Sequence, residues 1–139
     1  MRPQQLLNAL RERTRQVQMG PDVPYSHLDP LRDSGLMKVV RSKYSLTDTA
    51  KRLRNCAASY HDKIFARRCV FVVLENEDGK PIALGKADLP RGEAAPRWGE
   101  IKETSNRRPS EETRAAFARF LPSIERWWKD RRLGSRSSV

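Results

Sequence analysis

An uninterrupted apolar run at residues 69–74 constrains the fold more than any other feature of the chain. The run reads Cys-Val-Phe-Val-Val-Leu, and its β-branched and aromatic side chains favour a buried strand. Asp78 and Gly79 follow it, and this pair supplies the left-handed backbone position that a short hairpin loop requires. Residues 81–87 are the expected return strand, since the first residue of a strand tolerates Pro81. The sequence therefore predicts a central β-hairpin.

Apolar periodicity predicts two helices before this hairpin. Residues 4–18 carry apolar side chains at near-helical spacing, which predicts a first amphipathic helix. Residues 45–68 carry one apolar stripe with spacings of three and four, and Ser45 and Asp48 suit the start of a helix there. The apolar positions are Leu6, Leu10, Thr14 and Val17 in the first helix, and Leu46, Ala50, Leu53, Ala57, Tyr60 and Ile64 in the central one.

A third strand and a last helix complete the pattern. Residues 98–104 alternate weakly, which predicts a strand, and Ser110 suits the cap of a helix over residues 110–133. Pro122 lies inside that helix, so we expect a kink or a break there. Its apolar face comprises Ala116, Phe117, Phe120, Ile124, Trp127 and Trp128. The prediction is an α+β fold: a three-stranded, mainly antiparallel sheet with a hairpin, packed against two or three amphipathic helices.

The length of 139 residues fits a single domain. Cys56 and Cys69, with no secretory signal before them, fit a reducing cytoplasm, and the six-residue apolar run is far shorter than the roughly 20 residues of a membrane span. We therefore expect a cytoplasmic protein without a membrane partner. The expected order is a helix within residues 1–20, a wrapping loop at 21–44, the central helix at 45–68, the sheet at 69–104, the last helix at 110–133 and a frayed tail at 134–139. Within the wrapping loop, residues 36–40 fit either a short helix or a short strand.

Positive charge dominates the composition and is unevenly distributed. The chain has 28 Lys and Arg against 17 Asp and Glu, a formal net charge of +11, which favours a polyanionic partner. Residues 69–103 are the exception, with five basic and seven acidic side chains. The excess charge therefore belongs to the helices, and we expect their surfaces to contact the phosphates of DNA or RNA.

The candidate phosphate contacts surround the central and last helices. Arginine outnumbers lysine among them, which suits bidentate contacts to phosphate and stacking on bases. Trp127 and Trp128 are adjacent and point in different directions, so one of them is a candidate stacking surface. The predicted contacts are Lys51, Arg52, Arg54, Lys63, Arg67, Arg68, Arg107, Arg108, Arg114, Arg119, Arg126 and Arg131, and Lys129 and Arg132 extend the run on the last helix.

One short motif resembles a known family. The stretch Leu-Arg-Asn-Cys-Ala-Ala-Ser-Tyr at residues 53–60, followed by a hairpin, a third strand and an Asn-x-x-Pro turn at 106–109, is similar to the PcfJ-like domain of conjugative plasmids and phages. In that family a Leu-x-x-Cys-Val-Gly-Ser-Tyr type helix precedes a sheet that ends near a Gly-x-x-Asn turn. The resemblance covers residues 46–120 and implies a mobile-element setting without an established activity. The matching residues are Asn55, Cys56, Ser59, Tyr60 and Asn106, whereas Ala57 and Ala58 replace Val-Gly, and Thr104 and Ser105 stand where the glycine is expected.

Cys56 and His61 are the candidates for thiol chemistry. Cys56 lies beside the apolar stripe, and His61 points about 140° away from it on an ideal helix. We therefore expect Cys56 to pack inward as a small hydrophobe. His27, Cys56, His61 and Cys69 are zinc-ligand types, but they lack the close paired spacing of zinc motifs, so neither a metal nor a cofactor is predicted.

A small polar site is the other candidate. Asn55, Ser59 and Asp62 flank the apolar stripe, and Asn106 could join them. We favour a structural role, in which Asn55 or Ser59 hydrogen-bonds a neighbouring loop and Tyr60 packs in the core with its hydroxyl satisfied.

The predicted function is that of a non-enzymatic nucleic-acid-binding accessory subunit of a mobile-element or defence nucleoprotein complex. Its basic helices would contact the phosphate backbone, and a protein partner or larger complex is compatible with this role. One alternative is a protein-interaction subunit or inhibitor that docks on an acidic protein surface. Another is a hydrolase or nuclease centred on Cys56 and His61.

Overall fold

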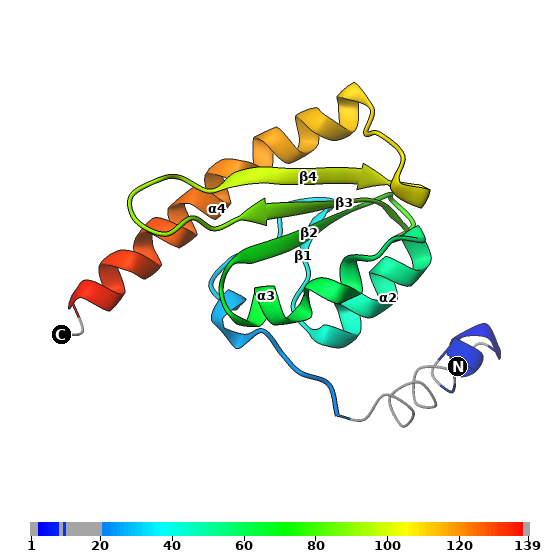
Figure 1. The fold of residues 1–139 in the computed structure, drawn as a ribbon. Coiled ribbons are helices and arrows are strands. Elements are labelled where there is room, and N and C mark those ends of the chain that lie inside the picture. Colours follow the sequence, from blue (N-terminus) through cyan, green and yellow to red (C-terminus); the bar gives the residue numbers. More distant parts are fainter. Residues whose placement is uncertain (1–2, 9, 11–20, 138–139) are drawn as a thin grey trace.

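One four-stranded antiparallel sheet forms the centre of the molecule (Figure 1). The structure, a computed structural model, describes residues 3–8, 10 and 21–137, with side chains as far as residue 132. The α+β class and the central hairpin are confirmed, whereas the prediction of three strands is wrong because the sheet has four. In spatial order they are β1 (Met37–Val39), β2 (Cys69–Glu75), β3 (Pro81–Asp88) and β4 (Arg97–Glu103), each antiparallel to its neighbour.

The additional strand lies in the segment predicted to be a wrapping loop. β1 has three residues, and its pairing places Met37 opposite Leu74. A strand of this length is too short for its alternation to be recognised in a sequence. The same segment contains a 3-10 helix, η1 (Ser26–Leu28). The wrapping loop predicted over residues 21–44 is therefore wrong at η1, and β1 shows that residues 37–39, which fitted either a helix or a strand, form a strand.

The turn between β2 and β3 has the predicted hairpin geometry. The Asn76 N–H donates to the Lys80 carbonyl at 2.9 Å, and Asn76 Oδ1 accepts from the Asp78 and Lys80 N–H groups at 3.0 Å. Gly79 takes a φ of 78°, the left-handed conformation that glycine adopts most easily. Pro81 begins β3, as the sequence predicts.

The central helix predicted over residues 45–68 is interrupted. The helix α2 (Lys43–Leu53) ends at Arg54, which takes the left-handed conformation with a φ of 55°. After Asn55 and Cys56, the chain continues as the 3-10 helix η2 (Ala57–Tyr60) and the short helix α3 (His61–Phe65). The prediction of one continuous helix is therefore wrong.

The start of α2 also differs from the prediction. Ser42 is the N-cap, and its side-chain oxygen accepts from the Ser45 N–H at 3.1 Å. Ser45 therefore lies inside the first turn instead of capping it. The cap lies three residues earlier because Ser42 has the extended backbone that an N-cap requires.

The last helix, α4 (Glu111–Ser137), covers one face of the sheet, and α2 and α3 lie on the other face (Figure 1). Ser110 caps it, since the Ser110 Oγ accepts from the Thr113 N–H at 3.2 Å. The helix continues through Pro122. Proline has no N–H, so one helical hydrogen bond is missing there, and because Pro122 is exposed, the gap lies on the solvent side of the helix. A break at Pro122 and an end at residue 133 are therefore wrong, and residues 138–139 lie outside the described residues. The predicted buried face is confirmed for Phe117, Phe120, Ile124 and Trp127, while Ala116 and Trp128 are half-buried.

The side chains of β3 alternate between the two faces of the sheet. Neighbouring residues of a strand point to opposite sides. Leu84 and Lys86 face the side of α2 and η2, where they line a pocket with Tyr60. Gly85 faces α4, where it lies against Phe117. The domain therefore has three layers, with α2 and α3 on one side of the sheet and α4 on the other.

The N-terminal residues are described only in part. Residues 3–8 and 10 are helical, and Leu6, Leu7 and Leu10 are each about half exposed. The rest of the helix predicted over residues 4–18 lies outside the described residues. Within the described ranges, no helix combines the length and the apolar character that crossing a membrane requires.

Candidate functional site

A cleft lined by four arginines lies where three elements meet, and we call it the arginine cleft. Arg67 and Arg68 follow α3, Arg91 belongs to the β3–β4 loop, and Arg132 belongs to α4. Its volume is about 650 Å³. No acidic side chain of the described residues lines it. The other lining residues are Ala66, Leu89, Pro90, Gly92 and Trp128.

Backbone turns hold these arginines in place. Arg67 takes a left-handed φ of 63°, and the Arg68 N–H donates to the Lys63 carbonyl at 2.9 Å as the chain leaves α3. The Arg68 carbonyl accepts from the Leu89 N–H, also at 2.9 Å. This bond ties the end of α3 to the start of the β3–β4 loop, so the arginines from these two segments are brought to one place.

Arg131 lies beside the cleft in surroundings that are already positive. Its Nη1 donates to the His27 carbonyl at 3.3 Å, and its guanidinium carbon lies 5.9 Å from the centre of the Trp127 ring. Burial lowers the pKa of Arg131, and the charge of Arg67 lowers this pKa further. Burial, followed by the charges of Arg67 and Arg131, lowers the pKa of His27 to about 4. Adding a proton here is therefore unfavourable, whereas an anion would be stabilised.

Of the predicted phosphate contacts, Arg67 and Arg68 line this cleft, and Arg132 from the extended run on the last helix joins them. Arg131 does not line the cleft, although it is close enough to Arg67 for that charge to lower its pKa. The two basic helices do not form one continuous surface, because α2 and α4 cover opposite faces of the sheet. Along α4, Arg114 and Arg132 are about 27 Å apart at 1.5 Å per residue. The remaining candidates are exposed elsewhere: Lys51, Arg52 and Arg54 on or after α2, Lys63 on α3, Arg107 and Arg108 after β4, and Arg114, Arg119 and Arg126 along α4.

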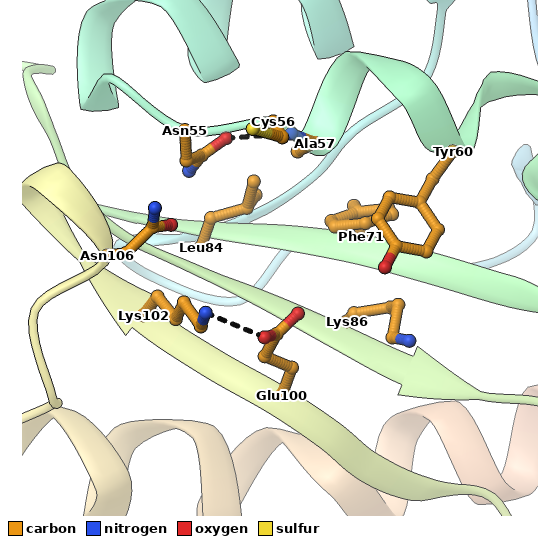
Figure 2. A pocket seen from close by; sticks show the side chains of 10 residues that line it. All are labelled: Asn55, Cys56, Ala57, Tyr60, Phe71, Leu84, Lys86, Glu100, Lys102 and Asn106. Atoms are coloured by element: carbon orange, nitrogen blue, oxygen red, sulfur yellow. Dashed lines mark hydrogen bonds and ion pairs between the residues drawn. The ribbon is translucent and has the colours of Figure 1, made fainter.

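A smaller pocket, which we call the polar pocket, lies between residues 55–60 and the sheet (Figure 2). Its volume is about 190 Å³. Ser59 is the one motif residue that does not line it, and its hydroxyl donates to the Cys56 carbonyl at 2.8 Å instead. The lining consists of the motif residues Asn55, Cys56, Tyr60 and Asn106, together with Ala57, Phe71, Leu84, Lys86, Glu100 and Lys102.

Hydrogen-bonding groups surround this pocket. Asn55 Oδ1 accepts from the Ala57 N–H at 3.0 Å, which leaves the Asn55 amino group for other partners. Neither the Asn106 amide nor the Tyr60 hydroxyl hydrogen-bonds another side chain within the part of the chain that the structure describes. Figure 2 shows Asn55 and Asn106 at one side of the pocket and Tyr60 at the other. The Tyr60 ring is half-buried and packs against Phe71 at the edge of the core, as predicted.

Two lysines make the pocket positive. Lys102 Nζ lies 2.9 Å from the Glu100 carboxylate, whose hydrogen bond and charge raise the pKa of Lys102. Lys86 Nζ lies 3.6 Å from Asp88 and 4.9 Å from the centre of the Tyr60 ring. With Glu100 as the one acidic residue in the lining among the described residues, the pocket favours a ligand that carries negative charge or several hydrogen-bond acceptors.

The expectation that Cys56 packs inward is wrong. Because the helix is interrupted before Cys56, its side chain does not pack beside the apolar stripe, and the residue is exposed. Cys69, in contrast, is buried, and burial raises the pKa of its thiol to about 11. His61 shares a hydrogen bond of 2.8 Å with the Tyr25 hydroxyl and does not line the polar pocket with Cys56. In the described ranges, no three or more His, Cys, Asp or Glu residues are grouped to hold a metal ion.

Four residues of these sites were missed by the sequence reasoning. Arg91 was overlooked because the segment around it is acidic overall. Lys86, Glu100 and Lys102 lie on strands that were excluded for the same reason. Glu100 and Lys102 are two positions apart, which places them on one face of a strand. This spacing is the feature of the sequence that could have indicated them.

Comparisons with models of protein families, with curated proteins and with solved structures found no match for this chain. The similarity to the PcfJ-like domain therefore stays a prediction that rests on the motif residues.

Proposed function

We propose that this protein binds nucleic acid through the phosphate backbone, with the arginine cleft as its principal contact surface. The observation that carries the proposal is the convergence of Arg67, Arg68, Arg91 and Arg132 from three separate elements on one concave surface. Guanidinium groups form paired hydrogen bonds with phosphate oxygens. None of these arginines forms an ion pair with an acidic side chain among the described residues. Arg67 Nη1 donates to the Phe65 carbonyl at 3.4 Å, which leaves its other guanidinium donors available to a ligand.

The aromatic wall of the cleft favours a single strand. Trp128 is half-buried and lines the cleft together with Arg132. An exposed part of an indole ring next to arginines is a surface on which an unpaired base can stack, whereas the bases of a duplex are covered by their neighbours.

Binding rather than catalysis is proposed for the cleft. Its lining holds guanidinium groups, small residues and one indole, and it includes neither a nucleophile nor a general base from the described residues. We propose the role of an accessory subunit in a mobile-element or defence nucleoprotein complex, and the short motif similarity supports the mobile-element setting.

Two matched triple variants test the cleft. Arg67→Gln/Arg91→Gln/Arg132→Gln removes three charges at the cleft, and Arg107→Gln/Arg114→Gln/Arg119→Gln removes three charges at exposed positions elsewhere. Fluorescence anisotropy with a labelled single strand of about 12 nucleotides measures the Kd, the length being within the range of single-strand sites. Circular dichroism checks that both variants are folded.

We expect the cleft variant to bind about 100-fold more weakly, because each lost phosphate contact costs on the order of 1 kcal/mol. The matched variant should remain within about threefold of the unmodified protein. Equal losses in the two variants would show that total charge matters and its location does not, which overturns the proposal. Undetectable binding by the unmodified protein, combined with capture of an acidic protein, would favour the protein-interaction alternative.

A further inference from the structure

The polar pocket has the features of a ligand site that the arginine cleft does not use. We propose that it holds one unpaired nucleobase, either from the strand that the arginine cleft binds or from a free nucleotide. The first source rests on the proposed function. The second source does not depend on it.

The size of the pocket fits one heterocyclic base. Its volume of about 190 Å³ corresponds to roughly six water molecules at about 30 Å³ each, which is too small for a base pair. Leu84, Phe71 and Tyr60 provide apolar and aromatic surface, and polar groups surround it. Small-ligand sites combine apolar and aromatic surface with convergent polar groups, and this pocket has both.

The hydrogen-bonding groups suit the edge of a base. Asn55 and Asn106 present two carboxamides at one side of the pocket (Figure 2), and carboxamides pair with the donor and acceptor pattern of base edges. The bond from the Ala57 N–H to Asn55 Oδ1 orients the Asn55 amino group before any ligand arrives. Glu100 can accept from an exocyclic amino group, and Lys102 can donate to a phosphate or carbonyl oxygen.

Backbone strain is concentrated at the segments that carry these two amides. Arg54, directly before Asn55, has a φ of 55°, and Ser105 and Asn106 have φ values of 58° and 61°. Left-handed conformations cost most non-glycine residues, such as Arg54 and Ser105, on the order of 1 kcal/mol or more, whereas asparagine adopts them more readily. Their location at the pocket agrees with the general tendency of strained residues to occur at binding sites.

The pocket and the cleft lie close to each other along the chain. Lys86 lines the pocket and Arg91 lines the cleft, and the five residues from one to the other span at most about 16 Å at full extension, a distance that a few nucleotides can bridge. Lys63, whose Nζ is 4.9 Å from the centre of the Tyr60 ring, lies on the segment that leads from Tyr60 to Arg67. One strand could therefore occupy the cleft while placing a base in the pocket.

Cys56 provides a direct reporter of occupancy. Its exposed thiol lines the pocket, whereas Cys69 is buried. The rate at which Ellman's reagent modifies the full-length protein should therefore report access to the pocket. Three probes are compared: a single strand of about 12 nucleotides, an abasic strand of equal length and charge, and each nucleoside 5′-monophosphate. Anisotropy measures strand binding in parallel.

We expect the base-containing strand or a nucleoside monophosphate to slow Cys56 modification about tenfold at ten times its Kd. The abasic strand should bind in the anisotropy assay without this protection. Asn106→Gly keeps the left-handed backbone and removes the amide, so it should abolish the protection of Cys56 by the base-containing strand and by the monophosphate.

The results distinguish failure of the arginine-cleft proposal from failure of the polar-pocket proposal. If neither strand binds, the proposed function fails, and protection by a nucleoside monophosphate alone still supports a base in the pocket. If strands bind but intact and abasic strands protect Cys56 equally, the pocket proposal is overturned while the proposed function stands. It is also overturned if no probe protects Cys56, or if Asn106→Gly leaves the protection unchanged.

Discussion

Gly85 of β3 and Phe117 of α4 are in such close contact that no side chain fits between them. A Cβ atom at residue 85 would lie 2.5 Å from Phe117 Cε1. Trp98 completes this contact, since its Nε1 donates to the Phe117 carbonyl at 2.8 Å and its ring meets the Phe117 ring edge to face, with centres 4.9 Å apart. The position of α4 on the sheet depends on this contact, and so does the approach of Arg132 to the β3–β4 loop.

Gly85→Ala should therefore destabilise the protein. The added methyl group must displace either the Phe117 ring or the backbone of α4, and overpacking of this kind costs about 1–3 kcal/mol. Urea unfolding monitored by tryptophan fluorescence measures the loss. The double variant Gly85→Ala/Phe117→Leu is the control, because a smaller side chain at residue 117 relieves the clash and should make the combined loss smaller than the sum of the single losses. Additive losses would contradict the contact.

The two cysteines should differ strongly in reactivity. At pH 8 Ellman's reagent should modify one thiol of the folded protein quickly and the second only after unfolding, because burial raises the pKa of Cys69 to about 11 and blocks access to it. Cys56→Ser should remove the fast phase. If the fast phase survives in Cys56→Ser, the assignment of Cys56 as the exposed thiol is wrong.

His27 should make stability depend on pH between about 4.5 and 6.5. Burial lowers the pKa of His27 from 6.5 to about 4, so the unfolded chain binds a proton in this window and the folded protein does not. The stabilisation is complete above pH 6.5 and is lost as the pH falls toward 4, by on the order of 2–3 kcal/mol. Urea midpoints at pH 6.5 and 4.5 measure this. The stability of the His27→Gln variant should depend less on pH than the stability of the unmodified protein. An equal pH dependence of the two proteins would contradict the prediction.

The substitution of Arg54 by glycine and by alanine tests the interruption after α2. In a left-handed position glycine is favoured, so Arg54→Gly should be about 1 kcal/mol more stable than Arg54→Ala. Inside a continuous helix the order would reverse, because alanine is favoured there by roughly 0.5–1 kcal/mol. The unfolding free energies of the two variants therefore decide between an interrupted and a continuous helix.

The sheet was the more predictable part of the fold. Residues 69–74 and the Asp78-Gly79 turn specify a hairpin through local preferences, and the structure contains it. The interruption at Arg54 was not predictable from spacing, because Leu46, Leu53 and Ile64 of the predicted stripe all remain buried. Burial periodicity reports which side chains face the core, and a short 3-10 segment can keep that face while changing the path of the backbone.

Both candidate sites depend on contacts between distant parts of the chain. Charge by segment indicated Arg67 and Arg131, but it excluded Arg91, because a segment with a negative sum can still contribute one arginine to a positive surface. The motif indicated Asn55 and Asn106 as a possible pair. Their partners in the pocket, such as Lys102, are brought near them by the pairing of β3 with β4, which the spacing of Glu100 and Lys102 on one strand does not specify.

The salt dependence of single-strand binding tests the central claim most directly. The logarithm of the affinity should fall linearly with the logarithm of the salt concentration, with a slope of about 0.7 for each phosphate contact. The variant Arg67→Gln/Arg91→Gln/Arg132→Gln should therefore have a slope smaller in magnitude by about 2, while Arg107→Gln/Arg114→Gln/Arg119→Gln keeps the original slope. A cleft variant whose slope equals that of the unmodified protein would contradict phosphate binding at the arginine cleft.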